Sequence, residues 1–155
     1  MKTYLASRYG RRLEMLAHAE ELKALGVEVT SRWVTGVHEK PGKGDGHGPV
    51  PYTTEEQAHF AREDAEDIAR SDALILFTEE PGASGGARGG RFVEMGIALA
   101  LNKTVVVIGP RENCFCCLAS IDHYDDWESF IADGRKARMI TDLLARACGG
   151  DRSLN

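Results

Sequence analysis

A glycine-rich segment that runs into a glutamate is the first feature of the sequence with clear chemical potential. Residues 79–91 contain Gly89 and Gly90 near their end and lead directly into a helical pattern that carries Glu94. Glycines let a backbone approach a ligand closely, and the free N–H groups at the start of a helix favour an anion. We expect Glu94 in the first turn of a helix, where the helix field keeps a carboxylate ionised, as a nucleophile must be. The plainer interpretation is a carboxylate that only stabilises the helix, by about 0.3–1 kcal/mol.

A basic segment near the N-terminus is the second candidate. It reads Ser7-Arg8-Tyr9-Gly10-Arg11-Arg12, between a short apolar run and a helical pattern. Three arginines within five residues would form a local basic pocket in an acidic protein. Arginine forks and a helix N-terminus there would suit a phosphate. The alternative is that Arg11 and Arg12 are solvated helix residues.

The remaining candidates argue against a metal or a cofactor. Cys114, Cys116 and Cys117 with His123 could supply soft ligands, but their spacing is not a familiar zinc pattern, and buried structural cysteines fit better. The Gly-x-Gly strings lack the strand, turn and helix of a dinucleotide fingerprint. We therefore expect neither a metal nor a cofactor.

The elements that must position these residues alternate between strands and helices. Apolar or β-branched runs predict strands, and apolar residues at helical spacing predict helices. The predicted strands are residues 3–6, 27–34, 72–77, 104–108 and an edge strand at 120–123. The predicted helices are residues 13–25, 53–71, 92–101, a short helix at 113–118 and a final helix at 127–147. This alternation predicts an α/β fold, a three-layer sandwich with a central parallel sheet of about five strands.

In such a sheet ligands bind outside the carboxyl ends of the strands. The segments after Ala6, Val34, Phe77 and Ile108 should therefore hold the site. Residues 35–52 are rich in glycine and proline and too long for an ordinary connection, so they form either an insertion or an active-site lid.

Length and charge set the broad class. The chain has 155 residues, which fits a single domain over 1–155. Its net charge of −5 gives no general attraction for nucleic acid polymers or anionic membranes. The apolar runs are short of the ~18 residues that cross a bilayer. Early arginines and four cysteines without a disulfide framework lead us to expect a cytoplasmic protein.

Several of these segments together resemble the nucleoside 2-deoxyribosyltransferase family, which includes the related nucleoside 5'-monophosphate N-glycosidases. The resemblance spans about residues 2–109. It is carried by Asp64-Ala-Glu-Asp-Ile-Ala-Arg-Ser-Asp72, by the strand after it, and by Gly89-Gly-Arg-Phe-Val-Glu94-Met-Gly-Ile-Ala98. It implies a flavodoxin-like, Rossmann-like fold and cleavage of an N-glycosidic bond through a glutamate. It also implies that Glu94 is the nucleophile, Asp64 the acid that serves the base and sugar, and Tyr4 the tyrosine that orients the nucleophile.

The chemistry that the resemblance implies is self-consistent. A carboxylate attacks the anomeric carbon through an oxocarbenium-like state and forms a covalent glycosyl-enzyme. Asp64 would protonate the departing base, for which its pKa must be raised. Without the resemblance, Asp64 would pass as a solvated residue in an acidic stretch with Glu63, Glu66 and Asp67.

The resemblance leaves the substrate open. The loop of Ser7, Arg8, Tyr9, Gly10 and Arg11 is similar to the loop of the nucleotide N-glycosidases and suggests a 5'-phosphate. The loop before Gly90 is longer than in the family, and no acidic residue at 83–88 matches the one that often contacts the base. The sugar would pass to another base or to water.

The resemblance also implies an assembly, and it leaves rival functions. Family members complete their sites with residues of a neighbour, and the loop Arg111-Glu112-Asn113 is a candidate donor. We therefore expect a homodimer or higher homo-oligomer whose partner is a small nucleoside or nucleotide. A non-catalytic nucleotide-sensing module is the rival from another class. A phosphoribohydrolase of the lysine-decarboxylase-like group fits less well, because its Pro-Gly-Gly-x-Gly-Thr order is absent.

Overall fold

The computed structural model describes residues 1–36, 52–80 and 89–133, and its centre is a five-stranded parallel sheet. The spatial order of the strands is β2-β1-β3-β4-β5. Their bounds are β1 Lys2–Ala6, β2 Glu28–Val29, β3 Ala73–Phe77, β4 Thr104–Ile108 and β5 Asp122–Tyr124. The order 2-1-3-4-5 is that of flavodoxin-like folds. The predicted α/β class and the parallel sheet of about five strands are thus confirmed.

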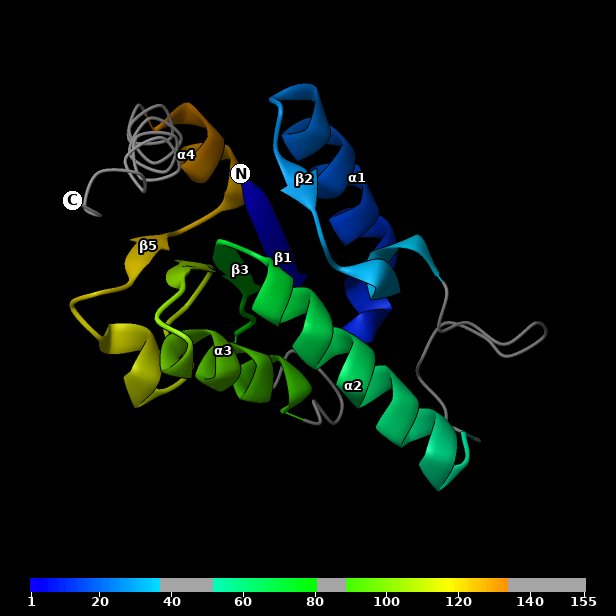
Figure 1. Ribbon diagram of the computed structural model, residues 1–155. Coiled ribbons are helices and arrows are strands. Elements are labelled where there is room, and N and C mark those ends of the chain that lie inside the picture. Colours follow the sequence, from blue (N-terminus) through cyan, green and yellow to red (C-terminus); the bar gives the residue numbers. More distant parts are fainter. Residues whose placement is uncertain (37–51, 81–88, 134–155) are drawn as a thin grey trace, which may run out of the picture.

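Helices cover both faces of this sheet and make three layers (Figure 1). Helices α2 and α3 pack together on one face, while α1 and α4 lie on the other. Their bounds are α1 Arg12–Ala24, α2 Thr54–Arg70, α3 Gly90–Ala100 and α4 Trp127–Ala132. Short 3₁₀ helices η1 Tyr9–Arg11, η2 Arg32–Thr35 and η3 Cys114–Cys117 complete the connections.

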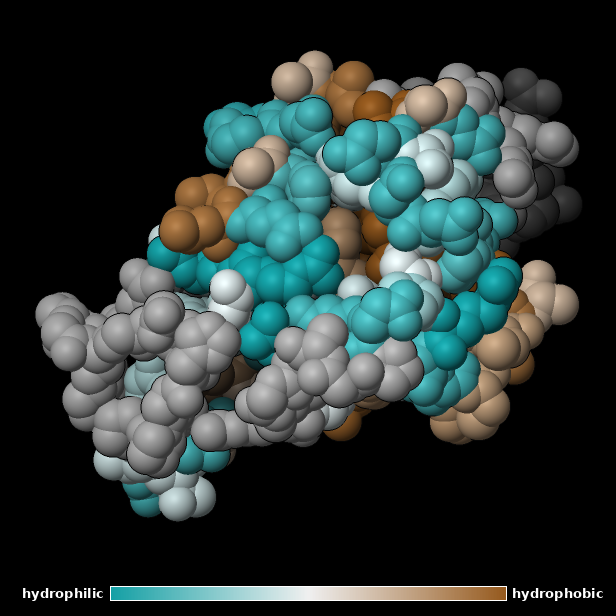
Figure 2. Space-filling view, turned by 180° about the vertical axis from the view of Figure 1, so that it is seen from behind, coloured by the Kyte–Doolittle hydropathy of each residue, from teal (hydrophilic) through white to brown (hydrophobic). Residues whose placement is uncertain are grey.

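The two central strands carry the core because both of their faces are covered. All five residues of β3 are buried, and so are the last four of β4. Continuous apolar runs are the signature of such strands in a parallel sheet. Figure 2 shows that hydrophilic groups cover most of the face seen from behind and that apolar groups lie between them near its centre.

The predicted strand at residues 27–34 is largely wrong, because pairing ends at Val29. Beside Leu5 the Ser31 hydroxyl forms the hydrogen bonds that a paired strand would form. Its oxygen accepts from the Leu5 nitrogen at 2.6 Å, and it donates to the Leu5 carbonyl oxygen at 3.3 Å. The chain then turns into η2, where the Trp33 indole nitrogen donates to the same carbonyl at 3.0 Å. Side-chain hydrogen bonds have replaced backbone pairing, which strand propensity cannot anticipate.

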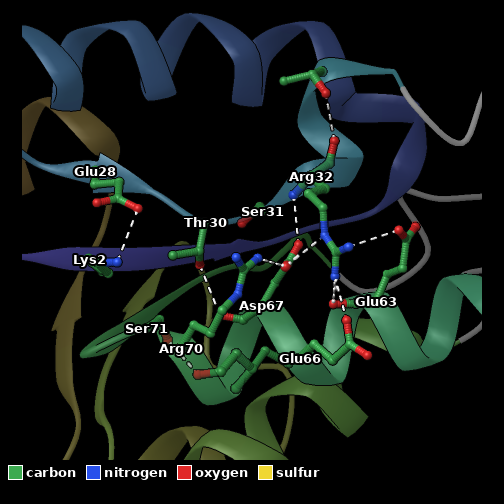
Figure 3. A network of polar contacts seen from close by, with 12 residues as sticks. Lys2, Glu28, Thr30, Ser31, Arg32, Glu63, Glu66, Asp67, Arg70 and Ser71 are labelled. Atoms are coloured by element: carbon green, nitrogen blue, oxygen red, sulfur yellow. Dashed lines mark hydrogen bonds and ion pairs between the residues drawn. The ribbon is translucent and has the colours of Figure 1, made fainter.

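A network of charged side chains fixes α2 against the segment after β2 (Figure 3). Arg32 donates to Asp67 at 2.8 Å, to Glu63 at 2.9 Å and to Glu66 at 3.0 Å. Asp67 is fully buried and also accepts hydrogen bonds from the Arg32 backbone and from Arg70. The acidic stretch of α2 therefore binds Arg32 through buried Asp67, part-buried Glu63 and exposed Glu66.

Other boundaries agree with the sequence pattern where the structure describes them. Helix α2 begins with a capping box between Thr53 and Glu56. The predicted helix at 113–118 is the 3₁₀ helix η3. Most of the predicted loop or lid at 35–52, and the part of the last helix beyond residue 133, lie outside the described residues. No helix within the described ranges is long and apolar enough to cross a membrane.

Candidate functional site

The segments that follow β1 and β3 meet at the point where the strand order reverses. In this topology β1 lies between β2 and β3. After β1 the chain crosses to β2 on one side, whereas after β3 it crosses to β4 on the other side, so the strand order reverses between β1 and β3. The segment after β1 carries Ser7 and Arg8, and the segment after β3 carries Thr78 and Glu79. Open α/β sheets bind ligands in the crevice at this switch point.

Three elements bring Tyr4, Asp64 and Glu94 together. Tyr4 lies on β1, Asp64 on α2 and Glu94 on α3. Burial raises the pKa of Tyr4 well above its ordinary value, and the nearby carboxylates of Glu94 and Asp64 raise it further. The three residues that the sequence placed 60 and 30 positions apart therefore form one cluster.

Glu94 is held in its neutral form more strongly than an exposed carboxyl. Burial of the carboxyl, followed by the charge of Asp64, raises the pKa of Glu94 to about 8, although the Tyr4 hydroxyl and Arg91 act in the opposite direction. Two carboxylates that share a buried site cannot both ionise freely. At neutral pH the pair therefore retains a proton in the absence of a ligand.

This finding corrects the expectation that the helix field keeps Glu94 ionised. Helix α3 starts at Gly90, two residues before the predicted start, so Glu94 lies in the second turn and the first turn carries no acidic residue. The effect of a helix terminus falls off within one turn. Desolvation is the larger influence here, and it favours the protonated carboxyl.

The buried Tyr4 hydroxyl oxygen and Glu94 Oε2 are among the polar atoms of this cluster that make no hydrogen bond of ordinary geometry within the described residues, although the two groups influence each other. Buried polar atoms in native proteins nearly always have a partner, so such exceptions often mark functional sites. The Tyr4 hydroxyl and Glu94 are therefore candidates for a hydrogen bond with a ligand group.

The basic segment after β1 is already engaged by carboxylates. Arg8 Nε lies 3.1 Å from Glu79 Oε1, and Arg11 donates to Glu14 and, at 3.2 Å, to the Thr78 carbonyl. Tyr9, Gly10 and Arg11 form η1. The Ser7 hydroxyl oxygen and Glu79 Oε2 are buried and lack partners among the described residues. The segment therefore offers both donors and an acceptor at the switch point.

The two glycines before Glu94 differ in what they do. Gly89 adopts a left-handed conformation with φ of 73° and precedes the first turn of α3, so a side chain there would strain the backbone. Gly90 is the first helical residue, and a Cβ atom placed on it would meet no atom within 4 Å. Gly90 therefore leaves open space beside the start of the helix.

Asn113 lies beyond β4 and caps η3. Its Oδ1 accepts hydrogen bonds from the backbone nitrogens of Phe115 and Cys116, at 2.9 and 3.3 Å. Cys116 is buried, whereas Cys114 and Cys117 are exposed, so only one of these three cysteines fits the expected buried structural role. No cluster of metal-ligating side chains occurs in the ranges that the structure describes.

Sequence reasoning gave no role to Arg32, Glu79 or Arg91, and it named Glu112 only within the loop expected to reach a neighbouring copy. Arg91 is buried, and its Nη2 lies 2.8 Å from a carboxylate oxygen of Glu112. These partners are separated by 21 to 71 positions, and no short motif links them. One available signal was the position of Arg91, one helical turn before Glu94.

Comparisons with known proteins agree with this architecture. The fold is that of the nucleoside deoxyribosyltransferase and nucleotide N-glycosidase structures. The chain superimposes on a 2-deoxyribosyltransferase from the psychrotolerant bacterium Bacillus psychrosaccharolyticus with a TM-score of 0.61 and 20% identity, over 88% of this chain and 95% of that one. It superimposes on the CMP N-glycosidase of Clostridium botulinum with a TM-score of 0.54 and 14% identity, over 90% and 99% of the two chains. No protein-family model and no curated protein matches the sequence.

Proposed function

We propose that this protein cleaves the N-glycosidic bond of a nucleoside or nucleoside 5'-monophosphate and passes the sugar to another base or to water. The observation that carries the proposal is the convergence of Tyr4, Asp64 and Glu94 from three elements beside the switch point. The structural neighbours, a 2-deoxyribosyltransferase and a CMP N-glycosidase, support the reaction class.

Glu94 is the proposed nucleophile. Its carboxylate oxygen forms a bond to the anomeric carbon while the bond from that carbon to the base nitrogen breaks, which gives a covalent glycosyl-Glu94 intermediate. Water or a second base then attacks the same carbon and releases Glu94. The leaving base needs a proton in the first step, and the acceptor gives one up in the second.

The proton held by the carboxyl groups of Glu94 and Asp64 is the one that the leaving base takes up in the first step. Because the pKa of Glu94 is raised, the proton has to leave Glu94 before the carboxylate can attack. The neighbouring carboxylate of Asp64, whose charge acts on Glu94, is the proposed acceptor, and once protonated it can donate to the departing base. One proton thus moves from Glu94 to Asp64 and on to the base, and both carboxylates are then free of it.

Tyr4 orients this exchange. Its hydroxyl faces both carboxylates, and its influence on Glu94 favours the ionised form. The raised pKa of the Tyr4 phenol keeps that hydroxyl protonated throughout the working range. A donor of this kind stabilises the anion that attacks and fixes its direction.

The substrate-binding residues of the proposal lie around this centre. Ser7, Arg8, Tyr9, Gly10 and Arg11 lie at the carboxyl end of β1, and Gly89 and Gly90 at the start of α3. The segment after β1 would hold the 5' end of the sugar, since it contains the basic residues. Asn113 would reach the site of a neighbouring copy.

We also propose a homodimer or higher homo-oligomer in the cytoplasm. Three side chains on α3 and around η3 are exposed although apolar: Val93, Phe115 and Leu118, with 66, 60 and 43% of their area accessible. They flank Glu94 and Asn113 in the sequence, so a neighbouring copy there could bring its own Asn113 toward the site. Light scattering at assay concentration tests this, and a fully active monomer would refute it.

Turnover is the test of the function. The protein is incubated with ribo- and deoxynucleosides and their monophosphates, with and without an acceptor base, and free bases are separated by chromatography. Base release without an acceptor indicates a hydrolase, and base exchange indicates a transferase. A 2'-fluoro-2'-deoxynucleoside should leave a glycosyl group on Glu94 that mass spectrometry detects. Binding without release of any base would instead identify a nucleotide-sensing module.

A further inference from the structure

Arg91 and Glu112 form a buried ion pair beside the candidate nucleophile, and the chemistry above does not use it. Arg91 Nη2 lies 2.9 and 2.8 Å from the two carboxylate oxygens of Glu112. The Arg91 side chain is 3% exposed and that of Glu112 is 16% exposed. Removing two charges from water costs solvation free energy that their attraction does not reliably return. A stabilising role is therefore a weak explanation of the pair.

The position of Arg91 suggests a functional explanation. Arg91 lies three residues before Glu94 on α3, so both side chains project from the same side of the helix. Its guanidinium is fixed by Glu112 and by the Phe92 ring, whose centroid lies 4.8 Å away. A charge that is held in place in a dry environment acts strongly on its neighbours.

The other groups near Glu94 shift its pKa in opposite directions. Asp64 from α2 adds negative charge, and the Tyr4 hydroxyl from β1 interacts with the carboxylate. Strands β3 and β4 carry no titratable side chain. Among the described residues, Arg91 is the cation that favours the ionised form of Glu94.

We propose that Arg91 is a positioning residue of the active site and that Glu112 sets how much of its positive charge acts on Glu94. The inference rests on the proposed function for the role of Glu94 and deepens it. In this arrangement the negative charge of Glu112 offsets part of the positive charge of Arg91. Glu94 and Asp64 therefore keep their shared proton until substrate enters. The segment after β4 thereby becomes coupled to the protonation of the nucleophile.

The experiment measures the titration of Glu94 directly, in ligand-free protein labelled with ¹³C at glutamate carboxyls, with Glu94→Gln to assign the signal. Glu112→Gln removes the negative charge and keeps the shape, so the midpoint of Glu94 should fall by roughly one pH unit. Arg91→Met combined with Glu112→Leu removes both charges, and the midpoint should rise by a similar amount. The double variant leaves no uncompensated buried charge, so it tests the proposal even if Glu112→Gln does not fold.

Glu28→Gln is the matched control. Glu28 is also a carboxylate paired with a cation, but its pair with Lys2 is exposed and lies at the amino ends of the strands. Its loss should leave the Glu94 midpoint unchanged. The proposal is overturned if the Glu94 midpoint is unchanged in both Glu112→Gln and the double variant Arg91→Met with Glu112→Leu. A shift in the opposite direction also overturns it. The titration needs no substrate, so it can fail while turnover is observed, and it can succeed while no substrate is cleaved.

Discussion

The guanidinium of Arg8 is bound by Glu79 across the switch point, with Arg8 Nε 3.1 Å from Glu79 Oε1. The two residues follow β1 and β3, and the Glu79 side chain is only 10% exposed. A phosphate that binds Arg8 must therefore compete with a carboxylate that is already in place. Binding of a 5'-phosphate at Arg8 therefore depends on whether the phosphate displaces Glu79 from this ion pair.

We predict that Glu79→Gln increases the use of a nucleoside 5'-monophosphate relative to the nucleoside. The substitution frees Arg8, and a charge-assisted hydrogen bond to phosphate contributes about 1.5–3 kcal/mol, which corresponds to ~10-fold or more in kcat/KM. Arg8→Ala should have the opposite effect on the monophosphate and leave the nucleoside nearly unaffected. The ratio of the two kcat/KM values is the measurement. If neither variant changes that ratio, the 5' end of the substrate does not lie at this pair.

Glu94→Gln should abolish most of the activity and leave the fold intact. A nucleophile supplies most of the chemistry, so we expect a loss of at least ~100-fold in kcat. Gln keeps the volume of Glu and carries no charge, so it can occupy the same buried position. Circular dichroism checks the fold. A folded variant with near wild-type turnover would exclude Glu94 as the nucleophile.

The same substitution should change how stability depends on pH. The pKa of Glu94 is raised to about 8 in the folded protein, above the ordinary 4.5 that applies on unfolding. Folding therefore binds a proton between these values, and the stabilisation present at low pH is lost as the pH rises toward 8. Glu94→Gln removes this dependence, so it should gain stability over the wild type between pH 5 and pH 8, on the order of a few kcal/mol. Urea unfolding at both pH values measures the gain, and parallel curves would contradict the prediction.

The contrast between fold and site shows what the sequence could reveal. Strands β3 and β4 were predictable because a doubly covered strand is almost continuously apolar, as all of β3 and the last four residues of β4 are. The roles of Tyr4 and Asp64 came from the family resemblance, since neither spacing nor composition distinguishes them from core and surface residues. The pKa of Glu94 was not predictable, because it depends on burial and on a carboxylate from another helix. The pairs of Arg8 with Glu79 and of Arg91 with Glu112 could not be predicted either, because their partners are 71 and 21 positions apart in the sequence.

Tyr4→Phe should separate orientation from binding. The Tyr4 hydroxyl lowers the pKa of Glu94, so its removal should raise that pKa further. The form in which Glu94 is ionised and Asp64 holds the proton then becomes rarer, and the pH at which kcat declines because the pair loses that proton should move to a more alkaline value. We expect kcat to fall while KM changes little. A pH profile of kcat with the wild-type midpoints would show that Tyr4 only fills space.

Arg32→Lys should lower both stability and activity, although the carboxylates that Arg32 binds lie on α2 and Glu94 lies on α3. Arg32 contacts Glu63, Glu66 and Asp67 (Figure 3), and these three residues lie within three positions of Asp64 in the sequence of α2. Lysine keeps the charge but not the planar fork that binds several carboxylates together. The turn of α2 that carries Asp64 then loses its attachment, so proton delivery to the base should slow. We expect a lower melting temperature and a lower kcat for substrates whose base needs a proton to leave. Lys2→Met is the control, because it breaks only the exposed pair with Glu28 and exposed pairs contribute little. Should Arg32→Lys lower the melting temperature and leave kcat unchanged, the network would serve the fold alone.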